Sequence, residues 1–150
     1  MKHITTIIML CLLALATGLQ AAVKETEVPY WVLTGILSVE TKSSYSREGG
    51  TEHIVYRDQR VGAAGELSAF QITVQAWQQV RHHGDHFQDL ATDQVYAERV
   101  AMDYLLWLYN GSAKRSWPLA VQMYHRGPGH RSYSYYANVA QRAKKEGYPQ

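Results

Sequence analysis

The feature that most constrains the fold is a run of apolar residues at helical spacing between about Gln94 and Tyr109. The residues on one face of this helix are Ala97, Val100, Ala101, Tyr104, Leu105 and Leu108. Such a face has to be buried against other elements, whereas the polar residues between them point to solvent. Asn110-Gly111 ends the pattern. The sequence therefore predicts a long amphipathic helix against which the rest of the chain packs.

Four further segments carry helix signals, and together they predict a mainly α protein with a compact helical domain. Their expected ranges are Pro29 to Glu40 or Thr41, Thr73 to about His83-Gly84, Ser116 to Tyr124, and Tyr133 to Lys145. Pro118 is suited to the first turn of the third segment, and His125-Arg-Gly-Pro-Gly-His130 is expected to separate it from the fourth.

The segments between the helices carry turn or strand signals. Lys42 to Gly50 is rich in Ser and Gly and predicts a surface loop. His53-Ile-Val-Tyr56 is β-prone and suits one strand of a small hairpin. Residues 85–91 are expected to form a loop before an N-cap at Thr92 or Asp93. Gly62 and Gly65 allow tight turns and a close approach to a ligand.

The start of the chain has the pattern of a secretory signal peptide. Lys2 precedes an apolar run from Ile4 to Leu15, and small residues follow at Ala21-Ala22. We expect residues 1–21 to be removed and residues 22–150 to form one exported domain, periplasmic or secreted, without stable membrane insertion. The apolar run is short for a membrane span, although an uncleaved anchor is the alternative. Cys11 would leave with the signal peptide, so packing without disulfides would hold the mature chain together.

Glu40 is the first candidate for a catalytic residue. It continues the helical stripe formed by Leu33, Ile36 and Leu37, where a charged group is out of place. Burial disfavours the charged form of a carboxyl group and raises its pKa, which lets it hold a proton near neutral pH. The pattern thus indicates a general acid at a helix C-terminus, unless the helix simply reaches water there.

Charge is distributed unevenly along the chain. Residues 22–110 carry twelve acidic and seven basic residues, whereas residues 111–150 carry seven basic residues and Glu146 as the one acid. For an exported protein such a basic part suits a cell-wall polymer better than nucleic acid, although a solvated helix face is the simpler explanation. The histidines at 82, 83 and 86 lack the spacing of zinc sites, so we predict no metal and no other cofactor.

Four short motifs in order resemble the lysozyme-like lytic transglycosylases and goose-type lysozymes. They are Glu40-Thr41, Gly65-Glu-Leu-Ser-Ala-Phe-Gln-Ile72, Met123-Tyr-His-Arg-Gly127 and Tyr135-Tyr-Ala-Asn-Val139. The resemblance covers Tyr30 to about Arg142 and implies an α+β lysozyme-like fold around a catalytic cleft. Among the departures from the family pattern, Thr41 replaces Ser, Ser68 replaces Gly and His125 replaces Asn. These departures affect contacts to the sugar more than the reaction.

The resemblance also implies a reaction and a set of site residues. Glu40 would protonate the oxygen of the β-1,4 bond between N-acetylmuramic acid and N-acetylglucosamine in peptidoglycan. The muramic acid 6-hydroxyl would then attack C1 and give a 1,6-anhydro product, so one carboxylate suffices, whereas an ordinary glycosidase needs two. The residues implied to contact the substrate are Glu66, Ser68, Phe70, Gln71, Tyr124, His125 and Tyr135, with the two tyrosines covering Glu40.

Two alternatives remain open at the level of sequence. Asp58 and Glu66 are candidate second carboxylates, and either one activating water would make the protein a hydrolytic muramidase. A lysozyme-like protein that binds glycan or a partner without cleaving it is the other alternative. The expected partners are peptidoglycan glycan strands and, for a small specialised enzyme, a secretion or conjugation apparatus. We expect a monomer.

Overall fold

The computed structural model describes residues 27–48, 51–55 and 61–148 and is mainly helical. The described elements, in chain order, are α2 (Tyr30–Glu40), β1 (Ser44–Glu48), β2 (Thr51–Val55), α3 (Val74–Val80), the 3₁₀ helix η1 (Phe87–Ala91), α4 (Gln94–Asn110), α5 (Trp117–Arg126) and α6 (Tyr133–Lys145). The expected signal peptide, Cys11 and Asp58 lie outside the described residues. Within the described part, no helix is both long and apolar enough to cross a membrane.

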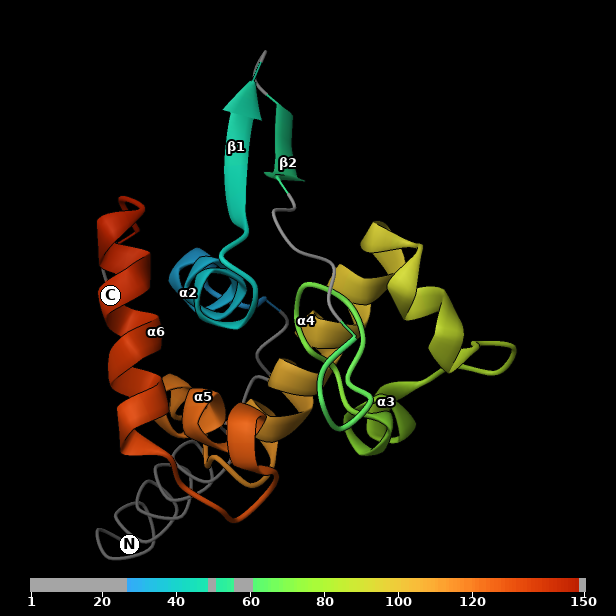
Figure 1. Ribbon diagram of the computed structural model, residues 1–150. Coiled ribbons are helices and arrows are strands. Elements are labelled where there is room, and N and C mark those ends of the chain that lie inside the picture. The colour runs from blue at the N-terminus through green and yellow to red at the C-terminus, as the bar shows by residue number, and fades with distance from the viewer. Residues whose placement is uncertain (1–26, 49–50, 56–60, 149–150) are drawn as a thin grey trace, which may run out of the picture.

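Helix α2 lies at the centre of the molecule. Figure 1 views it nearly along its axis, with α6 running beside it and the hairpin projecting away from the helices. Every residue from Val32 to Ser38 is buried, not only the predicted stripe, so α2 is a core helix rather than an amphipathic surface helix. Ile36 and Leu37 are fully buried, and burying each such side chain contributes about 1.5–3 kcal/mol.

The longest helix confirms its predicted buried face. All six predicted positions on α4, from Ala97 to Leu108, are buried. Of the residues expected to point to solvent, Glu98 is only half-exposed and accepts a hydrogen bond of 2.5 Å from the Tyr45 hydroxyl. Helices α3 and α5 pack against α4, and α5 also packs against α6. The hydrophobic core therefore lies among α2, α4, α5 and α6.

Caps explain where several helices begin and end. The side chains of Thr73, Asp93 and Ser116 each accept a hydrogen bond from the backbone amide three residues later, at the starts of α3, α4 and α5. Helix α5 extends two residues beyond the expected Tyr124, to Arg126, and Gly127 follows with φ 87°. Helix α3 ends at Val80, three residues earlier than predicted.

The expectation of a loop between residues 42 and 50 is wrong for most of its length. Ser44–Glu48 forms β1, which pairs antiparallel with β2 in the register Ser44 with Val55 and Glu48 with Thr51. The predicted β-prone segment thus forms a hairpin, and its partner is the segment that Ser and Gly had marked as a loop. Residues 87–91 form a 3₁₀ helix inside the other expected loop.

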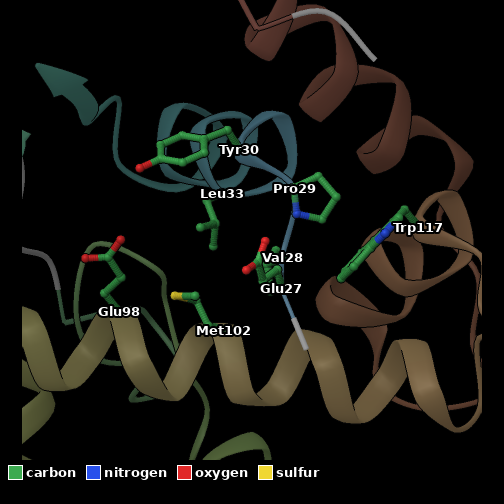
Figure 2. A pocket seen from close by; sticks show the side chains of 8 residues that line it. All are labelled: Glu27, Val28, Pro29, Tyr30, Leu33, Glu98, Met102 and Trp117. Carbon is green, nitrogen blue, oxygen red and sulfur yellow. The ribbon is translucent and has the colours of Figure 1, made fainter. Parts of the chain in front are cut away.

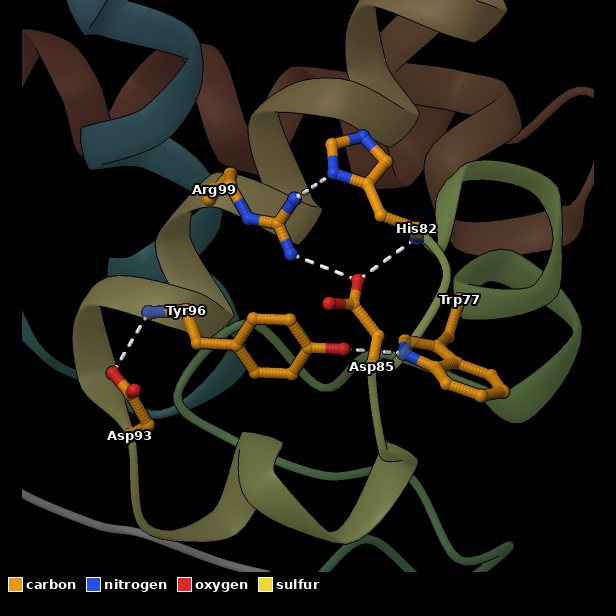
Figure 3. A network of polar contacts seen from close by, with 6 residues as sticks. All are labelled: Trp77, His82, Asp85, Asp93, Tyr96 and Arg99. Atoms are coloured by element: carbon orange, nitrogen blue, oxygen red, sulfur yellow. Dashed lines mark hydrogen bonds and ion pairs between the residues drawn. The ribbon is translucent and has the colours of Figure 1, made fainter.

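A polar network fixes α3 to α4 (Figure 3). The Arg99 guanidinium donates to Asp85 at 2.8 Å and contacts Nδ1 of His82 at 2.6 Å, while Asp85 also accepts from the His82 backbone amide. These bonds hold the pKa of Asp85 below its usual range, with the His82 amide as the largest cause. The Trp77 indole donates to the Tyr96 hydroxyl at 2.6 Å. The bonds of Arg99 join the turn after α3 to α4, and the Trp77–Tyr96 bond joins α3 itself to α4.

Candidate active site

Glu40 is the last residue of α2 and is held by a residue from the other end of the chain. The Tyr135 hydroxyl, in the first turn of α6, donates to Oε1 of Glu40 at 2.6 Å. The side chain of Glu40 is half-buried. Sequence motifs one and four, 95 positions apart, therefore meet in one hydrogen bond.

A close backbone approach brings these two residues together. At Gly35, an added β-carbon would overlap the carbonyl oxygen of Val139 and lie 2.7 Å from its Cγ1 atom. Glycine is therefore required for α2 and α6 to come this near. Tyr135 lies four residues before Val139 and so on the same helix face. The contact at Gly35 thus sets the position of Tyr135 relative to Glu40.

The segment from Gly62 to Thr73 forms one wall of the space beside Glu40, to which it contributes Ala63, Glu66, Gln71 and Thr73. It closes on itself through reciprocal backbone hydrogen bonds between Leu67 and Ile72. Ser68 and Gln71 have φ of 72° and 50°, which non-glycine residues adopt rarely. The side-chain amide of Gln71 donates to the Ser68 carbonyl at 2.9 Å. A β-carbon at Gly62 would overlap Oε2 of Glu66, so only glycine lets that carboxylate lie against the backbone.

Two side-chain bonds fasten this wall to the helices. The hydroxyl of Thr41, which follows Glu40 directly, donates to the Ala69 carbonyl at 3.1 Å. The Tyr124 hydroxyl, from α5, donates to the Phe70 carbonyl at 2.8 Å. The first, second and third motifs are therefore joined around Glu40. Thr41 retains the hydroxyl that serine would supply at this position.

A hollow of about 220 Å³ opens beside Glu40. The residues that line it are Glu40, Ala63, Glu66, Gln71, Thr73, Tyr124 and His125. The hollow thus brings together the predicted catalyst and four of the predicted contact residues, which are Glu66, Gln71, Tyr124 and His125. The sequence analysis does not predict Ala63 or Thr73 as lining residues. Ala63 lies beside Gly62, and Thr73 directly follows the Gln-Ile segment, so their positions next to predicted site residues are the sequence signal for them.

Burial raises the pKa of Glu40 above its ordinary range, and the nearby negative charge of Glu66 raises it further. The Tyr135 hydrogen bond acts in the opposite direction because it stabilises the carboxylate. Burial also raises the pKa of Tyr135 well above its usual value, so this hydroxyl keeps its proton. A carboxyl group that holds a proton beside a hollow can protonate a bound leaving group.

Not every predicted contact residue lines the hollow. Phe70 is fully buried in the core, and Ser68 is buried with its hydroxyl accepting from the Phe70 amide at 3.2 Å. The prediction that their side chains contact the substrate is therefore corrected: both shape the wall from behind. Tyr135 holds Glu40 as predicted, but Tyr124 bonds to the Phe70 carbonyl rather than to Glu40.

His125 lies over the ring of Tyr135. The two rings stack with centroids 4.5 Å apart and planes 12° from parallel. Burial, and to a smaller extent the nearby Arg126 charge, lower the pKa of His125. The imidazole of His125 is therefore largely neutral at neutral pH and lies against the ring of the tyrosine that holds Glu40.

A larger hollow of about 560 Å³ lies at the opposite end of α2 (Figure 2). Glu27 and Glu98 lie on its wall with apolar residues, among them Tyr30, Met102 and Trp117. None of the predicted site residues lines it. Glu27 is exposed, whereas Glu98 is half-buried and accepts a hydrogen bond from the Tyr45 hydroxyl, as Glu40 does from Tyr135. Glu98 differs from Glu40 in that it lies outside the four motifs.

Among residues 27–48, 51–55 and 61–148, no three His, Cys, Asp or Glu side chains are placed to hold one metal ion. Comparisons with protein-family models, curated proteins and solved structures found no match for the chain. The resemblance carried by the four motifs therefore stays a prediction, and a functional assignment has to rest on the geometry around Glu40.

Proposed function

We propose that this protein is an exported peptidoglycan lytic transglycosylase of the lysozyme-like class, with Glu40 as its one catalytic carboxylate. The observation that carries the proposal is the half-buried Glu40 with its raised pKa, bonded to Tyr135 at the edge of a hollow. Four motifs far apart in the sequence supply this arrangement, in the order typical of that family.

In the proposed reaction, Glu40 donates its proton to the oxygen that links muramic acid C1 to C4 of the next N-acetylglucosamine. The C1–O bond breaks and the leaving sugar departs with a free 4-hydroxyl. The muramic acid 6-hydroxyl then bonds to C1, and its proton passes to the Glu40 carboxylate. Glu40 is thereby reprotonated for the next cycle, and the product is a 1,6-anhydro sugar.

A hydrolytic muramidase is the second candidate, and Glu66 is the observation that favours it. Its carboxylate shares the hollow with Glu40, where it could activate a water molecule. Oε2 of Glu66, however, accepts a hydrogen bond from the Ala64 backbone amide at 3.0 Å, which gives this carboxylate a role in shaping the loop. We therefore place the transglycosylase first.

Product analysis tests both candidates. We expect digests of purified peptidoglycan by residues 22–150 to contain anhydro-muropeptides, which mass spectrometry distinguishes from reducing products by the loss of one water. Reducing products alone would contradict the transglycosylase and support the muramidase. Binding of peptidoglycan without any soluble product would contradict both and leave a binding protein.

Tyr135→Phe tests the role of the hydrogen bond to Glu40. Because that bond lowers the pKa of Glu40, its removal is expected to raise this pKa further. A general acid works while protonated, so the alkaline limb of the kcat/KM profile is expected to move to higher pH. Tyr124→Phe is the matched control, since its hydroxyl bonds to the Phe70 carbonyl instead. If the alkaline limb of the kcat/KM profile lay at the same pH in wild type and in Tyr135→Phe, this role of the hydrogen bond would be contradicted.

A further inference from the structure

A second hollow of about 290 Å³ adjoins the hollow beside Glu40. Thr73, Tyr124 and His125 line both, so the two hollows share one boundary. The other residues of the second hollow are Gln75, Ala76, Gln79, Tyr104, Arg126, Gly127 and Pro128. It lies between α3 and the C-terminal end of α5. A molecule bound at Glu40 therefore has one neighbouring space on this side that can take an attached group.

The two hollows differ in charge. Glu40 and Glu66 make the first one acidic. The second contains no carboxylate among its lining residues, and it offers the Arg126 guanidinium with the amides of Gln75 and Gln79. Arg126 is exposed in the last turn of α5, and no acidic side chain within the described part of the chain forms an ion pair with it. The second hollow thus suits a group that carries a carboxylate.

The wall that carries these groups is held in place. Thr73 caps α3 through the Ala76 amide, and the Trp77–Tyr96 and Arg99–Asp85 bonds join α3 and its following turn to α4 (Figure 3). On the other side, the ring of Tyr124 lies 5.7 Å from that of Tyr104. Gln75 and Gln79 therefore line the hollow that Arg126 also lines, and they lie on a fixed helix, which reduces the ordering that binding would require.

The chemistry of the substrate distinguishes two occupants for this space. A further N-acetylglucosamine of a glycan strand is neutral and presents hydroxyl and acetamido groups, whereas a muramic acid without its stem presents one lactyl carboxylate. The peptide stem on muramic acid presents carboxylates, for which an arginine fork is the best partner among side chains. Resting on the proposed function, we propose that the second hollow binds the peptide stem through Arg126, so that the enzyme prefers stem-bearing over stripped glycan strands.

Arg126→Gln tests this proposal with two forms of one substrate. Glycan strands are prepared with their stems and, in a second portion, with the stems removed by an amidase and the exposed lactyl carboxylates converted to neutral methylamides. We expect wild type to show a higher kcat/KM on stem-bearing strands. The ratio of the two kcat/KM values is expected to fall roughly tenfold in the variant. This is the low end of the effect of losing a charge-assisted hydrogen bond, because Arg126 stays near water. Arg126→Lys is expected to retain part of the ratio.

Arg142→Gln is the matched control, because Arg142 is also an exposed arginine in a last helical turn but lines neither hollow. It is expected to keep the wild-type ratio. An unchanged ratio in Arg126→Gln, or a ratio of one in wild type, would overturn the proposal. An equal loss on both substrates would also overturn it, since Arg126 would then serve the sugar or the fold.

A binding measurement separates this proposal from the proposed function. In the Glu40→Gln background, calorimetry compares a disaccharide that carries its peptide with the same disaccharide whose lactyl group ends in a neutral methylamide instead. Tighter binding of the first, lost on adding Arg126→Gln, supports stem recognition whether or not the protein is an enzyme. Equal binding of the two disaccharides would overturn stem recognition and leave the reaction at Glu40 unaffected.

Discussion

Glu40→Gln is expected to lower kcat on purified peptidoglycan by at least the ~10²–10⁴-fold typical of general acid–base catalysis. Glutamine keeps the shape of the side chain and can still accept the Tyr135 hydrogen bond, but it has no proton to donate. The release of soluble muropeptides, followed by chromatography, measures the loss. Wild-type turnover in this variant would remove the catalytic assignment of Glu40.

Glu66→Gln is the matched control, because it removes a second carboxylate from the same hollow. If Glu40 acts alone, Glu66→Gln costs far less activity and leaves the anhydro product unchanged. It also removes one cause of the raised pKa of Glu40, so the alkaline limb of the pH profile is expected to move to lower pH. A loss as large as that in Glu40→Gln would favour the two-carboxylate muramidase.

The Glu40→Gln variant is also expected to change how the free energy of unfolding depends on pH. A carboxyl group whose pKa is raised in the folded protein stabilises it fully only below the unfolded-state pKa, and this contribution is lost as the pH rises through the raised value. Glutamine has no such dependence. The free energy of unfolding, measured in urea, is therefore expected to shift in favour of the variant as the pH rises above the ordinary range of glutamate.

Gly35→Ala is expected to have the largest effect on folding. Alanine is the better helix former by about 1 kcal/mol, but its β-carbon would overlap the Val139 carbonyl oxygen. Overpacking of this kind typically costs about 1–3 kcal/mol, and here the obstacle is backbone that cannot change rotamer. Urea denaturation is expected to show a net loss of stability. Activity is expected to fall as well, because α6 carries Tyr135 away from Glu40.

Val139→Ala shows which atoms are responsible. It removes the Cγ1 atom that would lie 2.7 Å from the new β-carbon but leaves the carbonyl oxygen in place. The loss of unfolding free energy in the double variant Gly35→Ala/Val139→Ala is therefore expected to be at least the sum of the losses in the two single variants. If Val139→Ala restored the stability of Gly35→Ala, the side chain rather than the backbone would set the separation of α2 and α6.

The sequence predicts the helices best where capping and periodicity agree. Helix α6 has the predicted bounds, and α4 ends one residue beyond Tyr109. The prediction from sequence is wrong at β1. Ser and Gly in residues 42–50 favour a loop, and only pairing with β2 makes this segment a strand. Register and pairing depend on contacts between segments, which composition does not reveal.

The candidate site could be predicted in part. The stripe through Leu33, Ile36 and Leu37 led to Glu40, and the structure explains the raised pKa by burial. Phe70 could not be placed, since an apolar residue beside a polar motif suits a cleft wall and a core equally well. The contribution of Gly35 was also missed, because a glycine inside a helix gives no sign of which backbone approaches it.

The hydrogen bond between Tyr135 and Glu40 also bears on the order of folding. It closes a chain segment of 95 positions, whereas the Trp77–Tyr96 bond closes only 19. Contacts between distant residues form late because the entropy of closing the loop is lost first. The α3–α4 part can therefore form while α2 still lacks α6. A ribosome that stops before residue 133 releases a chain that lacks α6, so α2 loses the helix that packs along it and Glu40 loses the Tyr135 hydroxyl.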